Sequence, residues 1–78
     1  MVMSTWEWER YVATMCSDAW ELGPQVTRKV IDGLAFLVAS DQVNDLTVAE
    51  VLVRVGVNGA EADMAAPGIR ATIKRVRF

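Results

Sequence analysis

Five cations in the carboxyl-terminal third are the residues of this chain whose chemistry is easiest to interpret. They are Arg54, Arg70, Lys74, Arg75 and Arg77. Guanidinium and ammonium groups so spaced can neutralise phosphates, and Arg and Lys also donate hydrogen bonds to base edges. The cluster therefore predicts contact with nucleic acid. The alternative is an ordinary solvated helix face, because cations are stabilised near the C-terminus of a helix.

Aromatic residues near the amino terminus suggest a second kind of contact. Trp6, Ala13 and Trp20 are seven residues apart, so on a helix they form a stripe separate from the one that contains Trp8. Trp is enriched at the energetic centres of protein interfaces, which predicts a partner-binding face. The alternative is that other elements of the same fold cover both stripes.

The residue types needed for catalysis are sparse. The chain has no histidine, and its single cysteine, Cys16, is expected to be a small buried hydrophobe. No glycine-rich phosphate-binding motif is present, and the carboxylates are scattered. We therefore expect no enzyme activity, no catalytic residues, no cofactor, no metal site and no small-molecule substrate.

Size and composition predict one helical domain over residues 1–78. The hydrophobic fraction is 53% and the charged fraction 23%, which is enough apolar material for a core. The longest apolar run, 33–39, is too short to span a bilayer, and the acidic, aromatic start does not resemble a secretion signal. With one cysteine no internal disulfide can form, so we expect a cytoplasmic protein without a membrane partner.

Local signals divide the first half into two helices. A capping box of Ser4 and Glu7 predicts a helix from residue 4 to residue 22, ended by Gly23 as a left-handed cap followed by Pro24. The next helix, 24–40, is so apolar that we expect it to be the central element, covered by most of its neighbours.

The third helix is predicted to start at Thr47, which forms a capping box with Glu50. Leu46 and Val51 would then make a hydrophobic staple across this start. Gly56 is expected to end the helix in a left-handed conformation, with the following valine folding back over Leu52.

The last part of the chain is open to two interpretations. Residues 60–66 favour one or two helical turns, and Pro67-Gly68 predicts a break. Residues 69–78 fit a helix with Ile69 and Ile73 on one side, and fit a short strand less well. We expect an all-α bundle of four or five helices. The alternative is an α+β fold with a C-terminal strand.

The segment 46–76, LTVAEVLVRVGVNGAEADMAAPGIRATIKRV, resembles a helix-turn-helix. It is similar to the winged-helix-like module at the C-terminus of phage primase/helicase proteins of the virulence-associated E type. The resemblance implies a nucleic-acid-binding protein, or an accessory module in replication or regulation. Its last helix would carry Arg70, Lys74, Arg75 and Arg77 to the nucleic acid, with Arg54 beside them.

Charge and size support two other hypotheses. Residues 1–50 carry three basic and eight acidic residues, whereas residues 51–78 carry five basic and two acidic ones. In size and acidity the chain resembles small phage-encoded inhibitors of host defence, anti-CRISPR proteins among them. This likeness implies a protein-binding inhibitor that acts through its acidic, aromatic first helix. The third hypothesis is a structural subunit that forms a homodimer through its first helix and has no other partner.

Overall fold

The computed structural model describes residues 3–76, and the side chains of residues 7–74. The described chain folds into four helices without strands: α1 (Met3–Asp18), α2 (Pro24–Ala39), α3 (Asp45–Arg54) and α4 (Gly59–Val76). The all-α prediction is confirmed. The alternative of a C-terminal strand is wrong, since residues 69–76 belong to α4.

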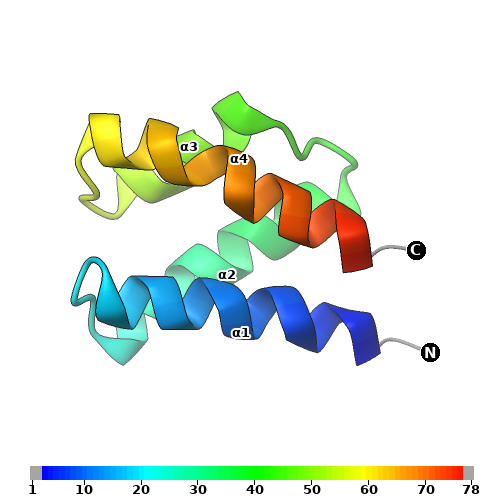
Figure 1. Cartoon of the computed structure of the whole chain (residues 1–78), viewed down its shortest axis with the longest axis horizontal. Coiled ribbons are helices and arrows are strands. Elements are labelled where there is room, and N and C mark those ends of the chain that lie inside the picture. Colours follow the sequence, from blue (N-terminus) through cyan, green and yellow to red (C-terminus); the bar gives the residue numbers. More distant parts are fainter. Residues whose placement is uncertain (1–2, 77–78) are drawn as a thin grey trace.

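The helices pack as a ring in which each contacts two others. α1 packs on α2, α2 on α3, α3 on α4 and α4 on α1, and the contact between α3 and α4 is the most extensive. Figure 1 shows α1 and α4 side by side, running in opposite directions, with α2 and α3 behind them. The prediction that α2 is the central element is therefore wrong, because within the described chain it packs only on α1 and α3.

The core fills the inside of this ring with apolar side chains at helical spacing. Its buried members are Trp8, Val12, Cys16, Val30, Leu34, Leu37, Val43, Val48, Ala49, Leu52, Val57, Ala62, Ala66, Ile69 and Ile73. Three of them are alanines, all on α3 and α4. These small side chains let the two helices approach closely, which accounts for their extensive contact.

The end of α1 differs from the prediction. The helix stops at Asp18, and Glu21 has the positive φ of 52° that was expected at Gly23. The amide of Leu22 donates to the carbonyl of Cys16 at 2.8 Å, and Leu22 packs against the core, which fixes this reversal of the chain. Gly23 has extended backbone and is the N-cap of α2. At its other end α1 begins at Met3, so Ser4 lies inside the helix and is not its cap.

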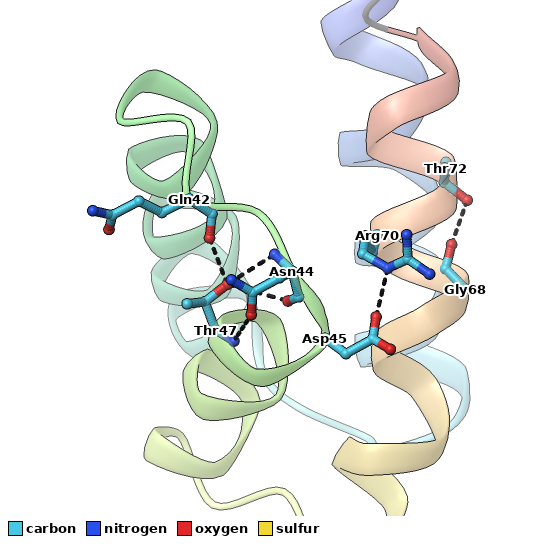
Figure 2. A network of polar contacts seen from close by, with 7 residues as sticks. All are labelled: Gln42, Asn44, Asp45, Thr47, Gly68, Arg70 and Thr72. Carbon is cyan, nitrogen blue, oxygen red and sulfur yellow. Dashed lines mark hydrogen bonds and ion pairs between the residues drawn. The ribbon is translucent and has the colours of Figure 1, made fainter.

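The start of α3 is set by a different capping box from the predicted one. The Asn44 side chain accepts from the Thr47 amide at 2.9 Å, and the Thr47 hydroxyl accepts from the Asn44 amide at 3.0 Å (Figure 2). The Thr47 hydroxyl also donates to the Gln42 carbonyl at 2.6 Å. This box makes Asn44 the N-cap, three residues before the predicted cap Thr47. It leaves Leu46 82% exposed, so the staple prediction is wrong.

The predicted end of α3 is confirmed. Gly56 has φ 103°, its amide donates to the carbonyl of Val53 at 3.0 Å, and the amide of Val57 donates to that of Leu52 at 3.1 Å. Both Val57 and Leu52 are buried, as a Schellman ending requires. The end of α2 has the same bond pattern, with Asp41 in the left-handed position.

The break predicted at Pro67-Gly68 is wrong, since α4 continues through both residues. Proline inside a helix costs about 3 kcal/mol. Its ring is exposed here, whereas Ala66 and Ile69 on either side are fully buried, so core packing holds the helix together. Gly68 faces α1, and a Cβ atom at Gly68 would lie 3.2 Å from the Tyr11 hydroxyl. Gly68, one of the two residues that looked like a break, thus permits a close approach of α1 and α4.

Candidate interaction surfaces

The groove between the start of α3 and the second half of α4 contains the clearest polar constellation. It has a volume of about 400 Å³ and is lined by Asn44, Asp45, Leu46, Arg70 and Lys74. We call it the α3–α4 groove. The Arg70 Nε lies 2.5 Å from the Asp45 Oδ1 and donates a hydrogen bond to it (Figure 2). Both side chains are exposed enough for this ion pair to contribute at most about 1 kcal/mol to stability.

The predicted nucleic-acid contacts are not all brought together. Arg70 and Lys74 share the α3–α4 groove. Arg54 lies at the far end of α3, about 14 Å along the helix from Asp45 at 1.5 Å per residue, and lines a groove on the opposite side of α3. The side chain of Arg75 and all of Arg77 lie outside the described residues. The three predicted contacts whose side chains are described therefore lie at two separate sites.

The groove between α2 and α3, which we call the α2–α3 groove, has a volume of about 300 Å³. Gly33 forms its floor: a Cβ atom there would lie 3.1 Å from Val51 Cγ1, so the helices approach closely at this point. Phe36, 68% exposed, stands beside it, and Glu50 and Arg54 lie on its α3 side. An aromatic ring thus lies next to charges of both signs.

The aromatic face predicted on α1 is only partly described. Ala13 lines a groove between α1 and α2 together with Ser17, Leu22 and others. Trp20 is half-buried and packs against the core, which favours a structural role for its ring. The side chain of Trp6 lies outside those described. Because α1 ends at Asp18, Trp20 lies in the turn after the helix, so the prediction that it continues a helical stripe with Ala13 is wrong.

The exposed apolar side chains lie elsewhere than the sequence suggested. Leu46 and Met64 are each 82% exposed, Phe36 is 68% exposed, and Val53 and Tyr11 are also exposed. The exposure of Phe36 could have been predicted from the sequence. Phe36 is seven residues after Lys29 and four after Asp32, so a helix puts it on the same side as these charged residues. For Leu46 the signal is the Asn44 cap, which turns it outward.

Cys16 is buried in the core, as expected. Burial raises the pKa of its thiol above the ordinary value of 9.0, and a hydrogen bond with the Thr27 side chain lowers it by less. Among the described side chains no three of the His, Cys, Asp or Glu type are placed to hold a metal ion. None of the helices in residues 3–76 is long and apolar enough to cross a membrane.

Comparison with known proteins does not assign a family. No family model, no curated protein and no solved structure matches this chain.

Proposed function

We propose that this chain is a small non-enzymatic protein-binding module. The observation that carries the proposal is the exposure of Leu46 beside Lys74 and the Arg70–Asp45 pair, in a groove of about 400 Å³. The core is filled without Leu46. A large side chain left in water next to oriented polar groups is typical of a contact residue in a protein interface.

The charges of the α3–α4 groove favour an acidic partner. Asp45 compensates Arg70, whereas Lys74 forms no ion pair with any described side chain, so the groove keeps one uncompensated positive charge. The N-terminus of α3 adds a partial positive charge from its backbone amides. The partner that fits is an amphipathic segment of another protein, with an apolar residue for Leu46 and a carboxylate for Lys74. Such contacts suit the inhibitor or adaptor hypothesis, although on a different surface from α1.

Photocrosslinking can test this groove with a matched control. The residue p-benzoylphenylalanine replaces Leu46 in one variant and the equally exposed Met64, outside the groove, in another. Both are irradiated in nuclease-treated lysate of the source organism. We expect a protein adduct from position 46 that is lost with Lys74→Glu, and no such adduct from position 64. Equal adducts at both positions, or no adduct at position 46, would contradict the proposal.

Binding to nucleic acid is the second candidate, and the shared groove of Arg70 and Lys74 supports it. It is less favoured because Asp45 offsets Arg70 and Arg54 lies on the other side of α3. Fluorescence anisotropy with labelled duplex and single-stranded DNA at low salt tests it. Affinity that falls steeply with salt and disappears in the double variant Arg70→Ala, Lys74→Ala would support this candidate over the first.

A further inference from the structure

We propose that two copies of this chain associate through the α2–α3 groove, related by a two-fold axis. A two-fold interface uses the same surface on both copies, so each feature must find its complement within that surface. The α2–α3 groove has an exposed ring, Phe36, next to a depression of about 300 Å³ that Gly33, Leu37 and Val51 line. The ring of one copy can therefore occupy the depression of the other.

The charges of the groove have the same self-complementary arrangement. Glu50 and Arg54 are one turn apart on α3, and both are exposed. Neither forms an ion pair with any described side chain. The ion pairs among the described side chains are Arg28–Asp32 and Arg70–Asp45. If two copies of α3 lie in opposite directions and cross midway between these two residues, Glu50 of each copy faces Arg54 of the other. A single groove with one acid and one base is thus suited to a second copy of itself.

The size of the chain makes such an association favourable. A stable interface buries about 800 Å² on each partner. The chain exposes 5153 Å², so an interface of that size would cover only part of its surface. Domains below about 80 residues have small cores and commonly gain stability from oligomerisation. This inference is independent of the proposed function, because it uses a different groove.

Reversing the charges of Glu50 and Arg54 tests this dimer, because each combination of variants has its own expected effect on association. Sedimentation velocity at tens of micromolar should give a dimer for the natural chain. Glu50→Arg alone and Arg54→Glu alone should each weaken the dimer at least tenfold, because like charges then face each other across the axis. A mixture of the two single variants should recover a heterodimer, since every facing pair is again opposite in charge. The double variant should recover the homodimer.

The aromatic contact has its own control. Phe36→Ser should weaken the dimer at least tenfold, whereas Met64→Ser, which alters an even more exposed side chain outside the groove, should leave it unchanged. All these positions are exposed, and an unchanged circular dichroism spectrum verifies folding. A single-chain mass for the natural protein at these concentrations would overturn the proposal. A dimer that tolerates Phe36→Ser, or single charge variants that do not recover on mixing, would overturn it as well.

Discussion

The α3–α4 half and the α1–α2 half of this molecule are held together in different ways. The side chains of Asn44 and Asn58 cap α3 and α4, the two helices of the second half. Between these helices Gly56 adopts the left-handed conformation. In the first half the left-handed residue is Glu21, and Gly23 caps α2 without a side-chain hydrogen bond. Side-chain caps and a left-handed glycine thus fix the helix ends of the second half, whereas the connection between α1 and α2 depends more on packing against the core.

The first prediction, with the largest effect, compares one leucine from each half. Leu52 of α3 is fully buried, and Leu22 after α1 is half-buried. We expect Leu52→Ala to lower the free energy of unfolding by about 2–5 kcal/mol, because it leaves a cavity in the core. Leu22→Ala should cost clearly less. Urea denaturation followed by circular dichroism measures both, and equal losses would contradict the difference between the halves.

The second prediction changes two of the three residues with positive φ in the described chain, Gly56 and Glu21. Gly56→Ala should destabilise the chain by about 1–2 kcal/mol from backbone strain alone, since a Cβ at Gly56 meets no atom within 4 Å. Glu21→Gly should stabilise it by up to about 1 kcal/mol, because it relieves the positive φ of that residue.

Thermal unfolding measures both shifts. Gly23→Ala is the control for the first half, since Gly23 has extended backbone and open space around it. Its effect should be smaller than that of Gly56→Ala, because the poorer capping by alanine is offset by the lower entropy of the unfolded chain. A larger loss at Gly23 than at Gly56 would show that Gly23 is the residue that requires glycine after all.

The third prediction, with no effect at neutral pH, concerns Cys16 in the first half. Its folded-state pKa lies above 9.0, so the folded chain keeps its proton where the unfolded chain loses it. At neutral pH both states are protonated and stability is unaffected. As the pH rises above 9, the unfolded state is favoured and stability falls. Urea denaturation from pH 7 to pH 10.5 should show a steeper fall for the natural chain than for Cys16→Ala. Equal slopes would contradict it.

Features of this fold that depend on nearby residues were predictable from the sequence, and features that depend on distant helices were not. The Schellman ending at Gly56 was predictable because its bonds and its contact between Leu52 and Val57 lie within a few residues of one another. The continuation of α4 through Pro67 was not, because the burial of Ala66 and Ile69 that offsets the proline depends on helices distant in the sequence. In the α3–α4 groove, too, local spacing was predictable and the distant contact was not. The presence of Arg70 and Lys74 on one helical side was predictable, but the Asp45 that pairs with Arg70 is 25 residues away.

By itself the sequence determined that this chain is helical, roughly where the helices lie and which side of each is apolar, since helical periodicity and capping act over a few residues. Only the tertiary structure decided which helices touch, and therefore which apolar side chains stay in water. Val53 and Met64 are exposed although they are as apolar as the residues of the core, and no local signal tells how many neighbouring helices will cover a given side of α3 or α4. That depends on the ring arrangement, which results from packing among all four helices.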